Sequence, residues 1–354
     1  MEFEIKNKVG LVLTGGGAKG AYHVGALKAL VELDIPIHSV AGASIGALNG
    51  AVVATAANLE LAHESLLNIW EALGNEKVIK ISKYAPAYLV MLGAMGIAFR
   101  TNPTVAAAHV VINKLAKLAG YEGPEISHQF LDDSPLVKIL EESTTPESLN
   151  KGLPLYVSTF ETDGGIADIL GVVKASLRLG NTKDSDYLHV QNLPDAEMQE
   201  ALMASAALPM LFRGRKILDK KYTDGGQGDW YGAGGNTPVK PLVDAGCNTI
   251  IIVHLCDGSA WDRKLYPDVN IIEIRPKETI ARGMGVADLL GFDHPRIGSW
   301  IKQGYEDSVS VLKPILDIVS KHNTLSSSRA ALNHALESSE HADEALSNAM
   351  KRIL

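Results

Sequence analysis

Residues Gly42 to Gly46 form a GxSxG sequence whose central residue, Ser44, could act as a nucleophile. Glycine two positions before and after the serine permits a cramped strand-to-helix turn that pushes the hydroxyl out of the backbone. The serine then lies at a helix N-terminus, where free N–H groups and the helix dipole face a developing anion. The alternative is a simple tight turn in which Ser44 caps the helix. We favour the nucleophile, because an apolar run precedes the motif and a small-residue helix follows it.

A second glycine-rich sequence, GGGAKG, runs from Gly15 to Gly20 after a predicted strand and before a predicted helix. Its spacing also satisfies GxGxxG, so a dinucleotide-binding domain is an alternative interpretation. That fold places an acidic residue at the end of the following strand to bind a ribose. Here Asp34 precedes that strand, and the strand ends in the GxSxG sequence instead. The spacing therefore disfavours a nucleotide site.

Successive backbone N–H groups of a glycine loop are also what the oxyanion of a tetrahedral acyl intermediate requires. We expect neighbouring parallel strands to bring Gly15, Gly16 and Gly17 beside Ser44, so that the loop forms an oxyanion hole. Lys19 adds a positive charge near the loop, or is a solvated lysine in the first helical turn. The two glycine motifs together favour acyl transfer over nucleotide binding.

A serine nucleophile needs a proton acceptor. His254 lies inside a buried apolar run, and His294 lies between an aspartate and a proline, so neither is in a recognisable base motif. Two Asp-Gly-Gly sequences begin at Asp163 and Asp224. The glycines after Asp163 are explained by a turn between two strands. Asp224 ends a short strand and leads into a glycine-dense loop, so it is our candidate for the base.

Alternating apolar runs and helical patterns predict an α/β fold with a mainly parallel sheet, because two strand–turn–helix units follow each other at the start of the chain. Leu155 to Phe160 and Ile166 to Val173, with Asp-Gly-Gly between them, predict a hairpin. The other predicted strands are Val9 to Leu13, Ser39 to Gly42, Lys216 to Leu218, Lys221 to Thr223, Thr249 to Leu255 and Asn270 to Ile274. The predicted helices include Ala21 to Leu33, Ile45 to Ala57, Pro194 to Ala207 and Pro238 to Ala245.

We predict a catalytic domain over residues 1–310, with a helical insertion without strands over about 59–149, and a helical extension over 311–354. The uncharged run from Ala85 to Phe99 is too short to span a bilayer. It is either a buried helix or a cap that contacts lipid. The extension carries an apolar stripe, which either packs on the parent domain or binds a partner or a membrane surface. The stripe residues are Leu325, Leu332, Leu336, Leu346, Met350 and Ile353.

The composition is that of a globular protein, with 354 residues, 46% hydrophobic and 21% charged, and a formal net charge of -8. This charge argues against a nucleic-acid partner. Cys247 and Cys256 belong to no metal-binding pattern, which indicates buried thiols in a reducing compartment. The first residues lack the order of a secretion signal, so we expect a cytoplasmic protein. No sequence resembles a metal site, and we expect neither a metal nor another cofactor.

Four separated blocks resemble the patatin-like phospholipase family, in the family's order, over about residues 8–255. They are GGGAKG from Gly15, GASIG around Ser44, ASAALP from Ala204 to Pro209, and Asp224-Gly225-Gly226 followed by Asn236 and Pro238. GxSxG alone would be a weak signal, whereas four blocks together are specific.

The resemblance implies a three-layer α/β/α fold and a Ser44–Asp224 dyad without histidine. The glycine loop would be the oxyanion hole, and Gly20, Gly42, Gly46, Gly225 and Gly226 would support the three motifs that contain them. Many members carry arginine where this chain has Lys19, which keeps the charge but loses the planar fork. The implied activity is hydrolysis of lipid acyl esters, of the phospholipase, lysophospholipase or esterase type.

The implied substrates are lipids presented at a membrane or micelle surface, where we expect peripheral contact. Two stretches could line the acyl groove or belong to the core, Tyr88 to Phe99 and Leu208 to Phe212. The lipid class and the oligomeric state stay open. A lipid-binding or acyl-carrier-binding protein without catalysis on the same fold is a further alternative.

Overall fold

The computed structural model describes residues 7–75, 80–81, 131–132, 143–163, 168, 171–172, 174–175, 178–207, 214–280 and 294–353. The chain divides into two units, Met1–Ser308 and Val309–Leu354. The strands are β1 Val9–Leu13, β2 Ser39–Ala43, β3 Lys80–Ile81, β4 Leu131–Asp132, β5 Leu155–Glu161, β6 Asp186–His189, β7 Arg215–Ile217, β8 Lys220–Asp224, β9 Thr249–Val253 and β10 Asn270–Ile274. The α-helices are α1 Ala21–Glu32, α2 Ile45–Thr55, α3 Leu59–Asn75, α7 Pro146–Lys151, α9 Asp195–Ser205, α10 Lys240–Asp244 and α12 His294–Ile353. Short 3-10 helices are η1 Gly17–Gly20, η2 Val190–Asn192, η3 Gly225–Gln227 and η4 Arg263–Leu265.

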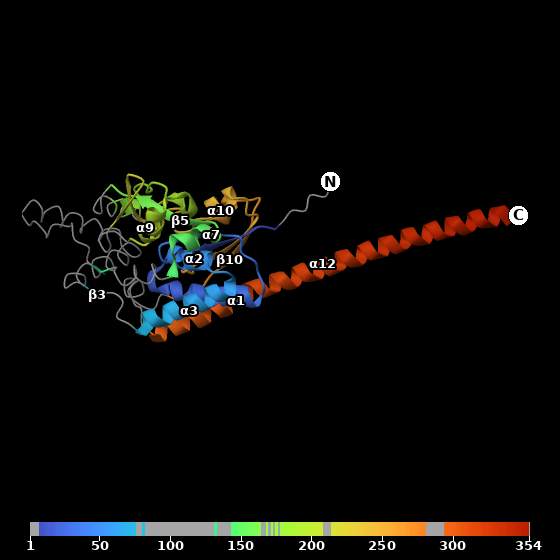
Figure 1. Ribbon diagram of the computed structural model, residues 1–354, viewed down its shortest axis with the longest axis horizontal. Coiled ribbons are helices and arrows are strands. Elements are labelled where there is room, and N and C mark those ends of the chain that lie inside the picture. Colours follow the sequence, from blue (N-terminus) through green and yellow to red (C-terminus); the bar gives the residue numbers. More distant parts are fainter. Residues whose placement is uncertain are drawn as a thin grey trace, which may run out of the picture. The chain divides into compact units, whose positions relative to one another are not determined.

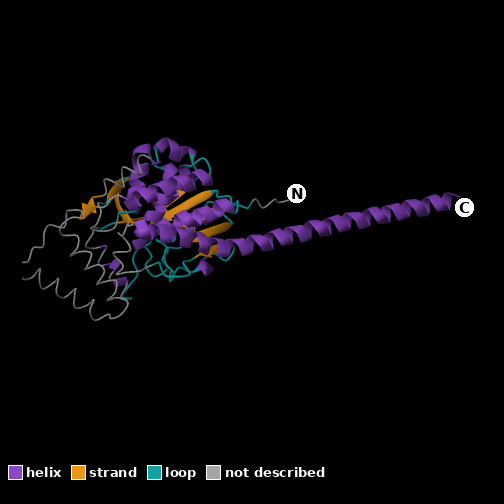
Figure 2. Ribbon diagram, turned by 90° about the horizontal axis from the view of Figure 1, so that it is seen from below, coloured by secondary structure: helices purple, strands orange, loops and turns teal. Residues whose placement is uncertain are grey.

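The central sheet has the strand order β10-β9-β1-β2-β5-β8-β7, with β6 also paired to β5. The successive pairs from β10 through β9, β1 and β2 to β5 are parallel. β6, β8 and β7 are antiparallel to theirs. Figure 2 shows helices beside the central strands. Parallel sheets need crossover helices that cover both faces, which accounts for the near-continuous apolar runs in β1 and β9.

Helices cover both faces of this sheet, because alternate residues of each strand point to opposite sides. Val12 of β1 and Ile252 of β9 pack with Leu242 of α10 on one face. Leu11 of β1 and Val253 of β9 lie on the other face, where α1, α2 and α3 supply the apolar neighbours, and Figure 1 shows α1 and α3 side by side. The fold is thus a layered α/β/α arrangement with a mostly parallel sheet, as the sequence predicts.

The first turns of α12 pack closely on α1 within the first unit. A Cβ on Gly25 would lie 1.9 Å from the carbonyl oxygen of Ile301, so only glycine permits this backbone approach. The Tyr22 hydroxyl donates a 3.0 Å hydrogen bond to Oδ2 of Asp307. Burial and the Asp307 charge both raise the pKa of Tyr22, which keeps it a neutral donor.

The predicted hairpin after β5 is wrong. The described residues between 168 and 175 are helical, and β6 pairs with β5 instead. Apolar residues here recur at i, i+3, i+4 and i+7, which is the period of a helix and not that of a strand. These residues are Ile166, Ile169, Leu170 and Val173.

The insertion begins with α3, and it is not free of strands as expected, because the two-residue strands β3 and β4 pair antiparallel. Ala85 to Phe99, with the proposed groove segment Tyr88 to Phe99, lies outside the described residues, as does Leu208 to Phe212. None of the helices in the described parts of the chain is long and apolar enough to cross a membrane.

Candidate active site

Ser44 occupies a sharp turn between the end of β2 and the start of α2. Its backbone angles are φ 54° and ψ −128°, a left-handed conformation that costs a non-glycine residue about 1–3 kcal/mol. The side chain makes no capping hydrogen bond to α2. The simple N-cap alternative therefore does not explain why a serine stands here.

The two glycines that flank the turn are required by close backbone contacts. A Cβ on Gly42 would lie 2.4 Å from the carbonyl oxygen of Gly46, and one on Gly46 would lie 2.1 Å from that of Leu13. The turn consequently presses the first turn of α2 against the carboxyl end of β1. This contact brings Ser44 beside the glycine loop that follows β1.

Asp224 ends β8 and is buried, with 3% of its surface exposed. Its position is fixed by the pairing with Thr159 of β5 and by a 2.9 Å hydrogen bond from its N–H to Ala207 O. Oδ1 accepts a 2.8 Å hydrogen bond from the N–H of Gly226. Oδ2 is buried and has no hydrogen-bond partner of standard geometry among the described residues.

The carboxyl group of Asp224 has a raised pKa of about 6, mainly because burial disfavours its charged form. The Ser44 side chain and the Gly226 N–H act in the opposite direction, since both stabilise the carboxylate. Ser44 and Asp224 are thus neighbours, although they are far apart in the sequence. Because the Gly226 N–H binds Oδ1, the buried Oδ2 is the carboxylate oxygen that no described residue binds with standard geometry.

The glycine loop lies directly against this pair. The Cβ position of Gly15 is 3.0 Å from Ser44 Cβ and 2.5 Å from Oδ1 of Asn236. The Gly15 N–H donates a 3.0 Å hydrogen bond to that same amide oxygen. The Cβ position of Gly226, next to Asp224, is 3.2 Å from it. Asn236 therefore joins the glycine loop to the loop that carries Asp224.

This bond corrects one detail of the predicted oxyanion loop, because the Gly15 N–H is already engaged by Asn236. The N–H groups of Gly16 and Gly17 make no hydrogen bond to any described residue, and they precede or begin η1. Such groups at the start of a helix are unsatisfied donors. Gly17 has φ 59°, which a glycine adopts without strain.

A serine that the sequence did not single out holds the turn in place. The Ser44 N–H donates a 3.0 Å hydrogen bond to Oγ of Ser205, whose hydroxyl donates to Ser158 O at 2.6 Å. Ser205 lies at the end of α9 in the ASAALP block. The block's order after the GxSxG motif was visible in the sequence, but its contact with Ser44 was not.

The other residues that the sequence analysis named are held by packing or by ion pairs. A Cβ on Gly20 would lie 2.6 Å from Ile45, and one on Gly225 would lie 2.2 Å from Ser158 O, so both allow close packing at the site. Lys19 lies half-buried in η1. Asp163 forms an ion pair of 2.8 Å with Lys183. Among the described residues, its polar contacts are with Lys183 and Asp168 and not with Ser44.

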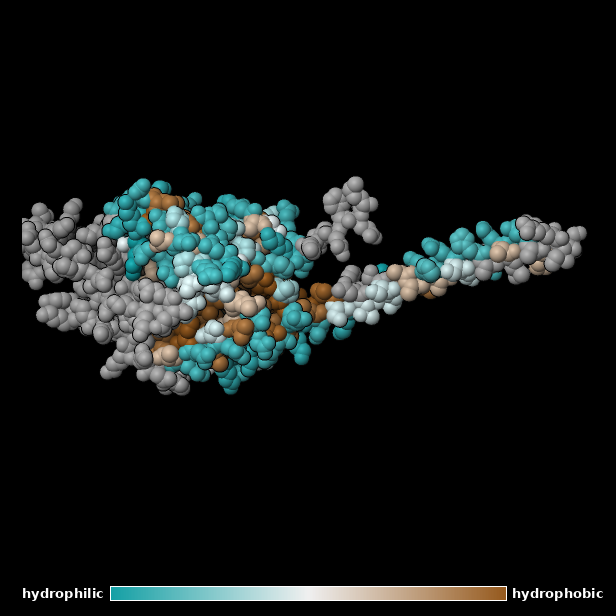
Figure 3. All heavy atoms as spheres, in the orientation of Figure 1, coloured by the Kyte–Doolittle hydropathy of each residue, from teal (hydrophilic) through white to brown (hydrophobic). Residues whose placement is uncertain are grey.

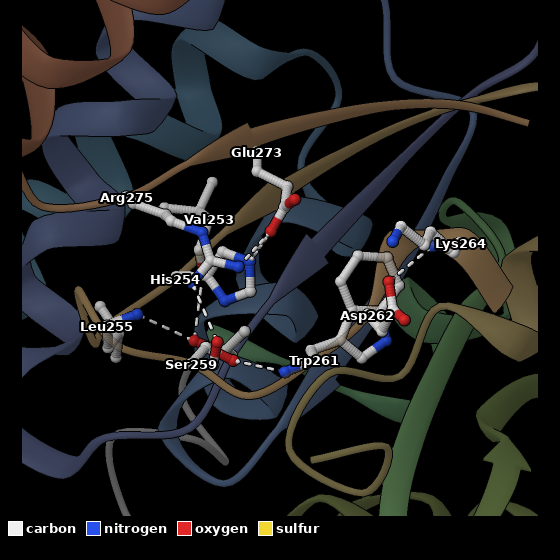
Figure 4. Close-up of polar contacts among 10 residues, drawn as sticks. Val253, His254, Leu255, Ser259, Trp261, Asp262, Lys264, Glu273 and Arg275 are labelled. Carbon is white, nitrogen blue, oxygen red and sulfur yellow. Dashed lines mark hydrogen bonds and ion pairs between the residues drawn. The ribbon is translucent and has the colours of Figure 1, made fainter. Parts of the chain in front are cut away.

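His254 is not placed as the base. Figure 4 shows its ring directed at Glu273 of the neighbouring strand β10, with Nε2 and Oε2 3.0 Å apart, and Arg275 pairs with the same carboxylate. Only 1% of His254 is exposed, and burial lowers its pKa. His294 begins α12. His254 is buried as the sequence suggested, although it lies directly after β9 and not within the strand.

A cavity of about 680 Å³ lies apart from the pair, between β6, α10 and the residues around η4. Its lining includes Tyr156, Tyr187 and Trp261 but neither Ser44 nor Asp224.

Within the described ranges, no cluster of three or more His, Cys, Asp or Glu residues could hold a metal ion. Asp34 is the acidic residue that a dinucleotide site would have used to bind the ribose. It lies in the turn after α1 and not at the end of β2.

Comparison with known proteins finds similar sequences and similar solved structures. The chain is 57% identical over 53 residues to neuropathy target esterase sws of Drosophila persimilis and 55% identical over 53 residues to that of Drosophila melanogaster. Each match covers 15% of this chain and 4% of the relative.

Among solved structures, VipD from Legionella pneumophila has a TM-score of 0.41 at 15% identity, covering 87% of this chain and 67% of VipD. ExoU, in its complex with SpcU from Pseudomonas aeruginosa, has a TM-score of 0.36 at 17% identity. The match covers 87% of this chain and 52% of that chain. The family model described as Patatin-like phospholipase matches residues 11–243 of the 354. The chain therefore belongs to the patatin-like phospholipase family.

Proposed function

We propose that this protein hydrolyses carboxylic esters of lipids through an acyl-enzyme on Ser44, with Asp224 as the general base. Membership of the patatin-like phospholipase family supports a lipid hydrolase. The observation that carries the finer proposal is the buried Asp224 carboxylate beside a strained, uncapped Ser44. A nucleophile, a base in contact with it and nearby N–H donors are the parts that acyl transfer needs.

In the first half-reaction, Asp224 takes the proton of the Ser44 hydroxyl while Ser44 Oγ bonds to the ester carbonyl carbon. The carbonyl oxygen becomes an oxyanion, which the N–H groups of Gly16 and Gly17 stabilise. As the intermediate collapses, the bond to the alcohol oxygen breaks and Asp224 returns the proton to that leaving group. The products are a free alcohol and an acylated Ser44.

In the second half-reaction, Asp224 takes a proton from water, whose oxygen attacks the acyl carbon. Collapse of this intermediate releases the carboxylic acid and returns the proton to Ser44 Oγ. A positioned base contributes typically ~10²–10⁴ in rate, and one oxyanion donor ~10²–10³. No step requires a metal or another cofactor.

Lipid esters are presented at the surface of a bilayer or micelle, so we propose peripheral contact of a cytoplasmic enzyme with such a surface. The family supports this class of substrate. The non-catalytic alternative on the same fold predicts lipid binding without turnover, and the dinucleotide alternative predicts nucleotide binding.

Hydrolysis assays test the proposal. Purified protein is incubated with mixed micelles of a phosphatidylcholine, a lysophosphatidylcholine or a triacylglycerol, and released fatty acid is measured. We expect turnover of at least one ester, abolished in Ser44→Ala and lowered at least a hundredfold in Asp224→Asn. Ser148→Ala and Asp195→Asn make the same chemical changes at exposed positions and are expected to keep full activity. Turnover that survives Ser44→Ala would contradict the proposal.

A further inference from the structure

The unit Val309–Leu354 carries exposed apolar residues with a seven-residue repeat. Ile318, Leu325 and Leu332 have exposed fractions of 68%, 53% and 60%. In the sequence this row continues at the same spacing through Ser339, Leu346 and Ile353. A second row starts four residues after the first and comprises His322, Arg329, Leu336, Asp343 and Met350. We call the two rows together the heptad seam.

The spacing of the heptad seam differs from the 3.6-residue period expected of an amphipathic helix that packs on its own domain. A straight α-helix drifts by ~20° for every heptad, so a strict seven-residue repeat stays on one side only if the helix supercoils. Here the first row is apolar from Ile318 to Ile353 except at Ser339, over about 50 Å of helix at 1.5 Å per residue, and the second row adds Leu336 and Met350. Repeats sustained over three or four heptads indicate a coiled coil. The seam therefore fits another helix with the same repeat.

The seam is uncovered among the residues that the structure describes. Leu336 and Met350 in the second row have exposed fractions of 56% and 58%. Figure 3 shows hydrophobic residues among hydrophilic ones along this part of the chain. Most of the stability of a helix in a protein comes from packing of its apolar face. A partner helix would supply that packing.

The charge of this unit does not fit a membrane surface. Helices that lie on anionic membranes are rich in Lys and Arg on the polar face and carry Trp or Phe on the other. This unit has no Trp or Phe, and its basic and acidic residues are equal in number. They are Lys313, Lys321, Arg329, Lys351 and Arg352 against Asp317, Glu337, Glu340, Asp343 and Glu344.

We propose that the heptad seam of one copy of this chain pairs with that of a second copy in an antiparallel two-stranded coiled coil. The charges within the seam set the orientation. In a parallel dimer, Arg329 would face Arg329 of the other copy and Asp343 would face Asp343, and like charges in a seam are destabilising. Reversing one helix removes both of these contacts.

The antiparallel register follows from the same positions. With Leu336 opposite Ser339 of the other copy, Leu325 lies opposite Met350, and the part of the seam from His322 to Ile353 is paired. Leu332 then lies opposite Asp343. Arg329 lies one layer from that Asp343, which brings opposite charges together across the seam.

The first test measures the oligomeric state of the full chain by size-exclusion chromatography with light scattering at up to about 100 μM. We expect a dimer for the unaltered chain and a monomer for the double variant Leu332→Glu, Leu336→Glu. The control Ala330→Glu, Ala331→Glu adds the same charge on the outer face of the helix and is expected to stay dimeric. A monomeric unaltered chain, or a dimer that survives the seam variant, overturns the proposal. A monomeric chain that sediments with phospholipid vesicles would also overturn the proposal, and would indicate that the seam binds a membrane surface.

The second test fixes the orientation by disulfide cross-linking. Cys247 is buried and Cys256 is half-exposed, so the background carries Cys256→Ser. The pair Leu325→Cys with Met350→Cys is expected to give a covalent dimer on mild oxidation, while Leu325→Cys alone is not. Efficient cross-linking of the single Leu325→Cys variant would show a parallel pair and overturn the antiparallel arrangement.

Discussion

The backbone N–H of Gly15 donates a 3.0 Å hydrogen bond to the side-chain oxygen of Asn236. This bond joins the loop after β1 to the loop after β8, and therefore the proposed oxyanion donors to the proposed base. It also separates the roles of three neighbouring glycines. Gly15 anchors the loop, while Gly16 and Gly17 keep N–H groups that no described residue accepts.

Asn236→Ala is expected to lower kcat for ester hydrolysis about fivefold with little change in KM. The reason is the loss of one hydrogen bond of about 1 kcal/mol that positions the oxyanion donors. Steady-state kinetics on the best lipid ester measures the effect. Asn150→Ala is the control, because Asn150 is exposed and its side chain donates a hydrogen bond to Asp195, away from Ser44. An unchanged kcat for Asn236→Ala would mean that Asn236 does not position the oxyanion donors.

The pH dependence of activity should follow Asp224. Its pKa of about 6 means that the base loses its charge as the pH falls through this value. We expect kcat/KM to be flat above about pH 7 and to fall tenfold per pH unit well below pH 6. A profile of kcat/KM from pH 4.5 to 8.5 measures this. A single ionisation near pH 4 would mean that burial does not control the carboxyl group.

The free energy of unfolding should also depend on the Asp224 carboxyl group, but it should fall with rising pH where activity rises. Because its pKa is raised from 3.8 to about 6, the folded protein holds a proton that the unfolded chain has released between these values. The contribution to the free energy of unfolding therefore falls as the pH rises through this window, by on the order of 3 kcal/mol. Asp224→Asn is expected to raise the free energy of unfolding at pH 7 by about 1–3 kcal/mol and to change it little at pH 4. Urea unfolding at both pH values checks this, and an equal loss of stability at both would contradict it.

Backbone strain at Ser44 predicts a difference between two inactive variants. Glycine adopts φ 54° without strain, whereas alanine does not. Ser44→Gly should therefore exceed Ser44→Ala in free energy of unfolding by about 1 kcal/mol, within the range of such backbone effects. Urea unfolding of the two variants measures the difference. Equal stabilities would indicate an unstrained turn.

Gly46 and Gly50 lie on the same helix, α2, and give a matched pair of substitutions. An alanine Cβ at Gly46 would lie 2.1 Å from the backbone oxygen of Leu13, which cannot move without shifting β1. At Gly50 the nearest atom is a Val40 side-chain carbon at 3.1 Å. We expect Gly46→Ala to abolish activity and lower the thermal midpoint strongly. Gly50→Ala should stay active and near the unaltered midpoint, since alanine also favours helix by about 1 kcal/mol. Comparable behaviour of both variants would contradict the packing described for the turn.

The fold was predictable where one signal dominated. The apolar runs of β1, β2 and β9 and the glycine turns that end β1 and β2 predicted a parallel sheet. The hairpin after β5 failed because a short apolar segment such as Ile166 to Val173 fits a strand or a helix until its period is counted. The pairing of β8 beside β5 depends on contacts between distant segments, which no local pattern contains.

The site was predictable to the level of its motifs and not of its hydrogen bonds. The positions of Ser44 and Asp224 follow from turns that glycine makes possible. That Ser205 accepts from the Ser44 N–H, and that Asn236 engages Gly15, depends on side-chain geometry across the sheet. Both residues stood in the quoted motif blocks, so their blocks were identified while their roles were not.

The most direct test of the central proposal is to label the protein with a fluorophosphonate and locate the adduct by peptide mass spectrometry. The account predicts one adduct, on Ser44, that forms at least a hundredfold more slowly in Asp224→Asn, while Asp195→Asn labels normally. An adduct on another residue, or labelling of Ser44 at an unchanged rate in Asp224→Asn, would contradict the pairing of this serine with this carboxylate.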